Sequence, residues 1–161
     1  MQLARAAAEF LAQRRIAVAG VSRAQPNAAN TIYRRLRTAG YEVFACNPNA
    51  EQVEGDVCYH SIGDIDGPLD GVVIATHPDA ALAVARDCVQ RGVPRVWLHR
   101  SLGAGSVSSE AVAFCEANGI AVIDGGCPLM FIQPVDLGHR CIRWVLDMTG
   151  KLPDGEKYRL A

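Results

Sequence analysis

The sequence predicts an open, doubly wound α/β sheet of the Rossmann type, with five or six mainly parallel strands and helices on both faces. Short apolar runs, the form expected of buried parallel strands, alternate along the chain with stretches of helical periodicity. Strands that are separated by helices pair in parallel through right-handed crossovers. The chain has 161 residues, 50% of them hydrophobic, which suffices for one domain with its own core.

Apolar runs mark the strands, and helical patterns fill the gaps between them. The five core strands are expected at 15–20, 41–46, 71–76, 95–98 and 120–123, with a weaker sixth near 57–59. An amphipathic helix opens the chain, and the others are expected at 28–39, at 78–91, before Gly119 with Ser106 or Ser108 as its cap, and at 137–148.

We expect residues 1–161 to form a single domain, because no linker or internal repeat divides the chain. Its core spans about 10–135, the last helix covers 137–148, and a polar tail follows at 151–161. Trp144 lies in that helix on an apolar face, which we interpret as a packing surface. An exposed part of the same face could also serve a homodimer. The apolar residues of the face are Leu137, Cys141, Trp144, Val145 and Met148.

Composition argues against several classes of protein. The net charge of −1 lacks the basic excess of a nucleic-acid-binding protein. No apolar run approaches the roughly 20 residues of a membrane span, and the first residues lack the apolar block of a secretory signal. We therefore expect a cytoplasmic protein that uses neither a membrane nor a nucleic acid. The six cysteines lie far apart without metal-ligand spacing, so no metal site is expected and most thiols should pack as small apolar groups.

The candidate ligand site lies where three strands end. In an open parallel sheet, ligands bind beyond the carboxyl ends of the strands, where the strand order reverses. These ends are 20–23, 47–49 and 76–78. The first opens a helix, whose N–H groups and dipole favour an anion such as a diphosphate. Gly20 allows a tight turn, and Ser22 offers a hydroxyl donor.

The first loop lacks the usual nucleotide fingerprints. Of the G-x-G-x-x-G pattern only Gly20 is present, and Asn47 stands where an acidic residue would hold a ribose hydroxyl. No Gly-Lys-Ser/Thr sequence of a P-loop occurs in the chain. Ordinary NAD use and ATP hydrolysis are therefore disfavoured, while a nucleotide with differently placed phosphates remains open.

Several fragments of the chain, taken in order and with their spacing, form one pattern. They are 19–22, Asn30, 40–43, Asn47-Pro48, 70–76, 96–98 with Gly103, and 124–128. This pattern resembles the CoA-binding domain family, the Rossmann-like module also found at the N-terminus of the succinyl-CoA synthetase alpha subunit and of NDP-forming acyl-CoA synthetases. The similarity covers roughly residues 10 to 135.

The resemblance implies that the ADP portion of CoA lies across the first three strand ends. Gly20, Val21, Ser22 and Arg23 would cradle the diphosphate, with Asn30 on the following helix. Asn47 and Pro48 would border the adenosine. The other side would be closed by Thr76, His77 and Pro78.

Two positions depart from the family pattern. Many relatives carry a lysine after the second-strand proline, suited to the 3′-phosphate, and this chain has Asn49. Arg23, or less plausibly Arg34 or Arg35, could supply the charge; otherwise CoA would bind weakly or another nucleotide would be the ligand. Many standalone members have a glutamine shortly after Trp97, where this chain has His99 and Arg100.

We favour a non-catalytic module that binds CoA or a short acyl-CoA, with no catalytic residue assigned. The phosphorylated histidine of the synthetases lies in a second domain, and the four histidines here lack a recognisable partner in sequence. The alternatives are an NADP-linked oxidoreductase, an acyl-CoA synthetase-like subunit completed by a partner chain, and a nucleotide sensor. Cys127 in Gly-Gly-Cys-Pro marks a tight turn or, alternatively, a thiol near the pocket that exchanges with CoA.

Overall fold

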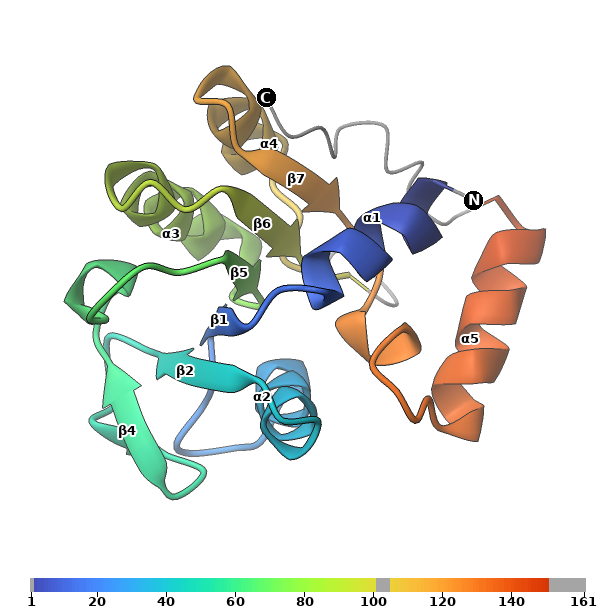
Figure 1. Ribbon diagram of the computed structural model, residues 1–161, viewed down its shortest axis with the longest axis horizontal. Coiled ribbons are helices and arrows are strands. Elements are labelled where there is room, and N and C mark those ends of the chain that lie inside the picture. The colour runs from blue at the N-terminus through green and yellow to red at the C-terminus, as the bar shows by residue number, and fades with distance from the viewer. Residues whose placement is uncertain (1, 101–104, 151–161) are drawn as a thin grey trace.

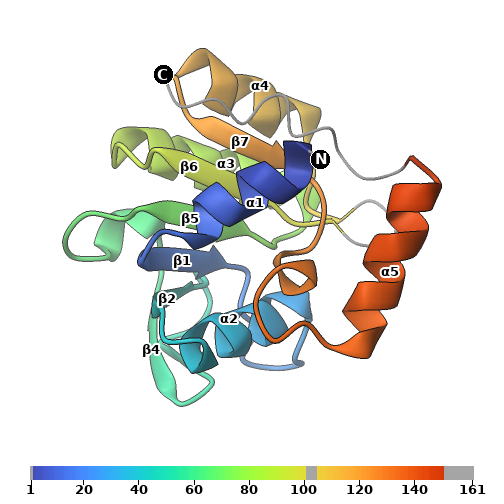
Figure 2. The ribbon, with the colours of Figure 1, turned by 45° about the vertical axis from the view of Figure 1, so that its right-hand side comes forward.

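The computed structural model describes residues 2–100 and 105–150 and shows a seven-stranded sheet with helices on both faces (Figures 1 and 2). The strands follow the order β3-β4-β2-β1-β5-β6-β7 and are parallel except for β3, which pairs antiparallel with β4. Their bounds are β1 Arg15–Ala19, β2 Glu42–Cys46, β3 Gln52–Val53, β4 Asp56–Tyr59, β5 Gly71–Ile74, β6 Arg95–Leu98 and β7 Ala121–Asp124. The predicted doubly wound α/β fold is confirmed, with the short β3 as an addition.

Within the described residues, five α-helices and two 3₁₀ turns accompany the strands. The helices are α1 Gln2–Leu11, α2 Ala28–Thr38, α3 Pro78–Gln90, α4 Ser109–Ala117 and α5 Leu137–Met148, and the turns are η1 Ile62–Asp64 and η2 Pro128–Met130. None of the helices within the described ranges is long and apolar enough to cross a membrane. Gly103 and the tail 151–161 lie outside the described residues.

Two apolar clusters hold the layers together, one on each face of the sheet. α1, α2 and η2 pack on one face, where Phe10 meets Trp97 edge to face with the ring centroids 5.4 Å apart. α3, α4 and η1 pack on the other face, through small side chains such as Ala81, Ala85 and Cys115. Because both faces are covered, the central strands β1 and β5 are buried throughout, apart from the first residue of β1.

The last helix, α5, packs differently from the prediction. It lies at the margin of the molecule in both views, beside η2 (Figures 1 and 2). Leu146 and Ile142 contact the core, whereas Trp144 and the other four apolar residues expected to pack are exposed. The helix carries two apolar faces, and the structure buries the narrower one. The interpretation of the Trp144 face as a packing surface is therefore wrong.

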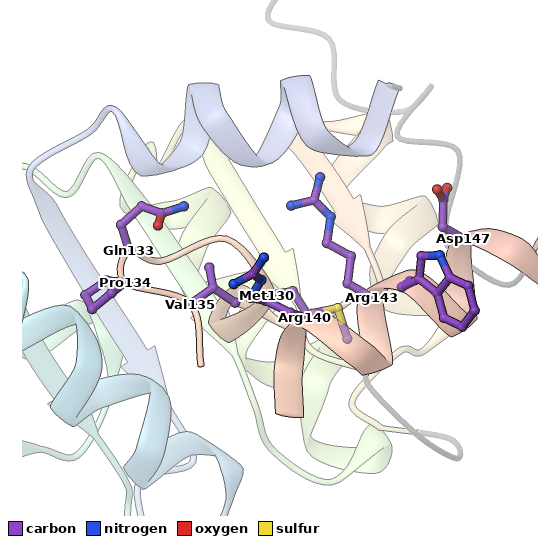
Figure 3. Close-up of a pocket in the computed structure, with 8 residues that line it drawn as sticks. Met130, Gln133, Pro134, Val135, Arg140, Arg143 and Asp147 are labelled. Atoms are coloured by element: carbon purple, nitrogen blue, oxygen red, sulfur yellow. The ribbon is translucent and has the colours of Figure 1, made fainter. Parts of the chain in front are cut away.

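A pocket of about 570 Å³ opens between α5 and the segment that follows η2 (Figure 3). Arg140 and Asp147 line it from α5, and Gln133 and Pro134 line it from the opposite wall. The guanidinium of Arg143 lies over the ring of Phe131, 4.6 Å from its centroid. This stacking fixes Arg143 against the body of the domain.

Candidate functional site

The strand order reverses at β1, and this places the candidate site. From β1 the chain proceeds through α2 to β2 and β4 on one side, and then returns to β5 on the other side of β1. α2 packs on one face of the sheet and α3 on the other. The carboxyl ends of β1, β2 and β5 therefore lie together at the switch point where such sheets bind ligands. All three predicted strand ends meet there.

Gly20 joins the ends of β1 and β5 at very close range. Its φ is +102°, and a Cβ placed on it would lie 2.5 Å from the carbonyl oxygen of Ala75. The N–H of Ala75 donates to the carbonyl of Ala19 at 3.0 Å, so neither strand end can yield easily. Only glycine combines this backbone conformation with so close an approach. The loop that follows β1 therefore begins at a residue whose position is fixed.

Ser22 organises the β1–α2 loop, residues 20–27, from within. Its hydroxyl oxygen accepts hydrogen bonds from the N–H groups of Ala24 and Gln25, each at 3.2 Å. A hydroxyl that accepts two bonds still has its own proton to donate. Ser22 therefore shapes the loop while keeping one donor for a ligand. Val21, beside it, is fully buried in the core.

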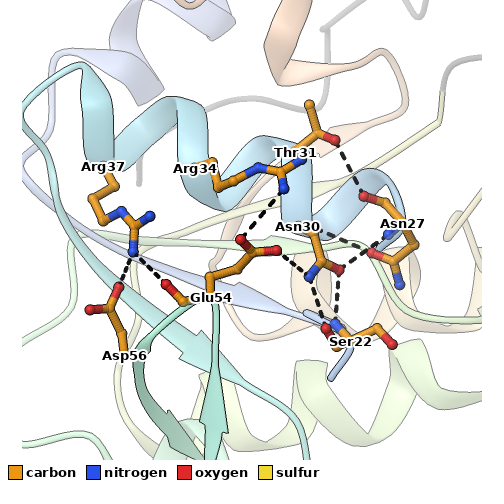
Figure 4. A network of polar contacts seen from close by, with 8 residues as sticks. All are labelled: Ser22, Asn27, Asn30, Thr31, Arg34, Arg37, Glu54 and Asp56. Carbon is orange, nitrogen blue, oxygen red and sulfur yellow. Dashed lines mark hydrogen bonds and ion pairs between the residues drawn. The ribbon is translucent and has the colours of Figure 1, made fainter. Parts of the chain in front are cut away.

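Asn30 holds the same loop from below (Figure 4). Its Oδ1 accepts from the N–H groups of Ser22 at 2.9 Å and Asn27 at 3.2 Å, and its Nδ2 donates to the Ser22 carbonyl at 2.8 Å. A fourth bond runs from Nδ2 to the Glu54 carboxylate at 2.7 Å. Two donors and two acceptor sites are all that an amide offers. This side chain, 1% exposed, is fully committed to the protein.

Asn27 caps α2 and ties it to the end of β1. Its side-chain oxygen accepts from the N–H of Asn30 at 3.2 Å, and its Nδ2 donates to the Gly20 carbonyl at 3.1 Å. Among the described residues, none accepts a hydrogen bond from the N–H groups of Arg23, Ala28 or Ala29. Ala28, the first residue of α2, is exposed at the positive end of the helix dipole, which favours an anion, whereas Ala29 is fully buried.

The β3–β4 hairpin supports α2 and was not predicted as part of the site. Glu54, at its turn with φ 53°, bonds to Asn30 and lies 3.5 Å from the guanidinium of Arg34 (Figure 4). Arg37 donates to the Glu54 carbonyl at 3.0 Å and pairs with Asp56. Hydrogen bonds from Tyr33 and Arg37 lower the pKa of Asp56. The only sequence signal for this support is the Glu-Gly pair of a tight turn.

Asn47 connects the end of β2 to the first loop. Its Nδ2 donates to the carbonyl of Val21 at 2.8 Å, and its side-chain oxygen accepts from the N–H of Asn49 at 2.9 Å. Its own N–H donates to the carbonyl of Tyr59 on β4. Pro48 follows as an exposed residue. Asn47 thus aligns two strand ends, and Pro48 offers a surface beside them.

The end of β5 carries the third group of predicted residues. Thr76 is held by Ser106, whose hydroxyl donates to the Thr76 carbonyl at 2.5 Å. His77 caps α3, with its Nδ1 3.2 Å from the Asp79 carboxylate, and Pro78 is the first residue of that helix. The imidazole of His77 is exposed, so it is accessible to a ligand. Sequence reasoning did not place Ser106 here.

The arginines near the loop differ in their availability. Arg34 pairs with Glu54, and Arg35 donates to the carbonyl of Pro134. Arg23 is exposed and, within the described part of the chain, has no hydrogen bond or ion pair. It is therefore the loop arginine that is free to meet an added phosphate.

Cys127 and His99, whose side chains could act as a nucleophile or a base, are buried near the end of the sheet. Burial raises the pKa of the Cys127 thiol to about 11, and its exposed fraction is 2%. Both facts disfavour a reactive thiolate and favour the tight-turn interpretation. Burial also lowers the pKa of His99, as does the neighbouring His139, so its imidazole is neutral at pH 7.

Comparison with known proteins gives a consistent picture. Residues 14–133 match the family described as "CoA binding domain". The uncharacterized protein YneT of Bacillus subtilis is 28% identical over 114 residues, which are 71% of this chain and 82% of that protein. A hypothetical protein from Pyrococcus horikoshii OT3 shares the fold, with a TM-score of 0.74 at 23% identity over 82% of this chain and 91% of its own.

One structural relative has a named activity. The dinucleotide-forming acetyl-coenzyme A synthetase 1 of Ca. Korarchaeum cryptofilum, in complex with phosphate and ADP, is 28% identical with a TM-score of 0.58. The match covers 67% of this chain and 25% of the synthetase chain. The chain is thus similar to a quarter of that enzyme.

Proposed function

Because the chain belongs to the CoA-binding domain family, we propose that it binds CoA or a short acyl-CoA through the ADP portion, at the carboxyl ends of β1, β2 and β5. The observation that carries this proposal is the hydrogen bonding that fixes the β1–α2 loop. The Ser22 hydroxyl binds backbone N–H groups of the loop, and the Asn30 side chain binds the Ser22 backbone. A loop held in this way meets its ligand without reorganising, which favours affinity.

The diphosphate would lie over the start of α2. The N–H groups of Arg23 and Ala28 and the hydroxyl proton of Ser22 would donate to its oxygens. Asn30 would not touch the ligand, because the protein uses all four of its hydrogen bonds, whereas Asn47 keeps one donor and one acceptor site for the adenosine. Their role would be to position the loop and the end of β2.

The adenosine would lie along the end of β2 beside Pro48, and the Thr76-His77-Pro78 segment would border the other side. Arg23 would supply the positive charge for the 3′-phosphate that a lysine at position 49 would otherwise meet. Its lack of a partner within the described residues supports this assignment over Arg34 and Arg35.

We favour binding without catalysis, so the protein would hold or deliver the cofactor in the cytoplasm. The alternative is a subunit whose acyl-CoA chemistry is completed by a partner chain. The similarity to a quarter of a synthetase chain favours this as the second candidate.

Isothermal titration with CoA, NADP, NAD and ATP tests the proposal. We expect CoA to bind most tightly, and a saturating concentration of about 100 times its Kd to add roughly 2.7 kcal/mol to the free energy of unfolding. Binding of NADP with no response to CoA would refute the proposal and favour an oxidoreductase. If CoA binds, acetyl-CoA turnover in cell extract that depends on the added protein would favour the partner-completed subunit.

A further inference from the structure

One face of α5 leaves four large apolar side chains exposed. The side chains of Leu137, Trp144, Val145 and Met148 are 76%, 64%, 49% and 68% exposed. With roughly 150–250 Å² for each large side chain, they expose on the order of 500 Å² of apolar surface. Patches of this size mark interaction sites on soluble proteins.

The spacing along this face is that of a two-helix seam. Leu137, Cys141, Trp144 and Met148 follow one another at intervals of four, three and four residues, the spacing of alternating d and a positions in a coiled coil. The intervals read the same from either end of the helix. Two copies of α5 in antiparallel orientation would therefore place Leu137 against Met148 and Cys141 against Trp144, each contact twice.

The residues that flank the seam are complementary in the same orientation. Arg140 and Asp147 lie on one flank, the flank that also lines the pocket beside η2. In antiparallel pairing, Arg140 of one copy and Asp147 of the other both lie between the Leu137–Met148 contact and the Cys141–Trp144 contact. Opposite charges therefore meet twice. Parallel pairing would instead set Arg140 opposite Val145 of the second copy, and neither Arg140 nor Asp147 would meet an opposite charge. On the other flank, Val145 would face Gly138 of the second copy, where the absence of a side chain leaves room.

We propose that α5 is the contact surface of a symmetric homodimer, formed by antiparallel pairing of the two α5 helices along Leu137, Cys141, Trp144 and Met148. Both copies together would bury about 1,000 Å² through these side chains, the lower end of specific interfaces. Ile142 and Leu146 on the opposite side anchor each helix to its own domain, so the seam is presented preformed. The ends of β1, β2 and β5 form no part of this surface.

Sedimentation equilibrium of the full chain over a concentration series tests the dimer. We expect a dimer in the micromolar range, and Trp144→Asp should raise its dissociation constant by about a hundredfold or more. Val57→Asp is the matched control, because Val57 is 62% exposed on β4 and lies outside the seam. A wild-type chain that stays monomeric at about 100 μM would overturn the proposal.

Charge reversal tests the orientation. Arg140→Asp should weaken association by about tenfold, because it sets two carboxylates against each other on each side of the twofold axis. Adding Asp147→Arg should restore the wild-type constant. A double variant that remains as weak as the single one would refute antiparallel pairing.

Thiol labelling tests which face is buried. Cys141 is exposed in the single copy and the other five cysteines are buried, so a maleimide should label Cys141 readily in dilute protein and more slowly as the concentration rises and the seam covers it. Cys141→Ser should abolish the labelling, and a labelling rate that does not depend on protein concentration would contradict burial of this face. A monomer that becomes a dimer only after residues 151–161 are removed would show that the tail covers the face, and would contradict a dimer of the full chain.

Discussion

Replacing Gly20 with alanine tests how closely the ends of β1 and β5 approach. The added Cβ would lie 2.5 Å from the Ala75 oxygen and 2.8 Å from the Ala75 carbonyl carbon, both backbone atoms that cannot rotate away. The residue would also have to keep a φ of +102°. Positive-φ strain costs about 1–3 kcal/mol, and overpacking adds about 1–3 kcal/mol. We expect Gly20→Ala to lower the free energy of unfolding by about 3–5 kcal/mol.

Gly40→Ala is the matched control for this variant. Gly40 has a similar φ of +88°, but a Cβ placed there would meet nothing within 4 Å. It should show only the backbone strain, about 1–2 kcal/mol. The difference between the two variants isolates the contact between the strand ends.

Urea unfolding monitored by circular dichroism measures both variants. Where enough Gly20→Ala folds, calorimetry should show weakened CoA binding, because the displaced strand end moves the loop. Gly40→Ala should bind as the wild type does. Equal destabilisation by the two substitutions would refute the argument that Gly20 is required by close packing.

Three further predictions follow from the site and the core. Asn30→Ala should lower the free energy of unfolding by about 2–4 kcal/mol, since it leaves buried partners without bonds, and should weaken CoA binding; unchanged affinity in folded protein would remove its positioning role. Arg23→Ala should leave stability unchanged and weaken CoA about tenfold while sparing 3′-dephospho-CoA; equal loss for both ligands would place Arg23 elsewhere. The stability of the protein should fall as the pH rises from about 9 to 11, because the unfolded chain ionises its thiols near 9 while burial raises their pKa in the folded state. Urea midpoints across this range measure the loss, and constant midpoints would contradict it. The pKa values are about 12 for Cys46 and about 11 for Cys115 and Cys127.

The fold could be predicted because each buried strand is a short apolar run and each helix between strands has readable ends. Pro78 begins α3 and Ser108 caps α4, as their chemistry indicates. β3 could not be predicted, since two residues in a hairpin carry no periodicity. The β3–β4 hairpin matters because Glu54 at its turn accepts a hydrogen bond from Asn30 of α2, a residue 24 positions earlier in the chain.

The orientation of α5 shows where periodicity fails. Its sequence has two apolar faces, one through Trp144 and one through Ile142 and Leu146. A hydrophobic pattern predicts that a helix face will be buried, but it does not predict whether that face packs against its own domain or against another chain. The domain buries Ile142 and Leu146 because they meet its core, and it leaves the wider face exposed.

The strand ends that meet at the candidate site could be predicted from topology, but the hydrogen-bond partners of individual side chains could not. Asn30 and Asn47 have the polar character of ligand contacts, yet the fold uses every bond of the Asn30 amide for its own loop. Whether an amide faces a ligand or the backbone depends on loop geometry that no spacing rule encodes.

A crystal structure of the protein with CoA tests the central claim most directly. We predict that the diphosphate lies at the start of α2, within hydrogen-bond distance of the N–H groups of Arg23 and Ala28. CoA bound elsewhere, for example in the pocket between α5 and Gln133-Pro134, with the β1–α2 loop empty, would contradict it.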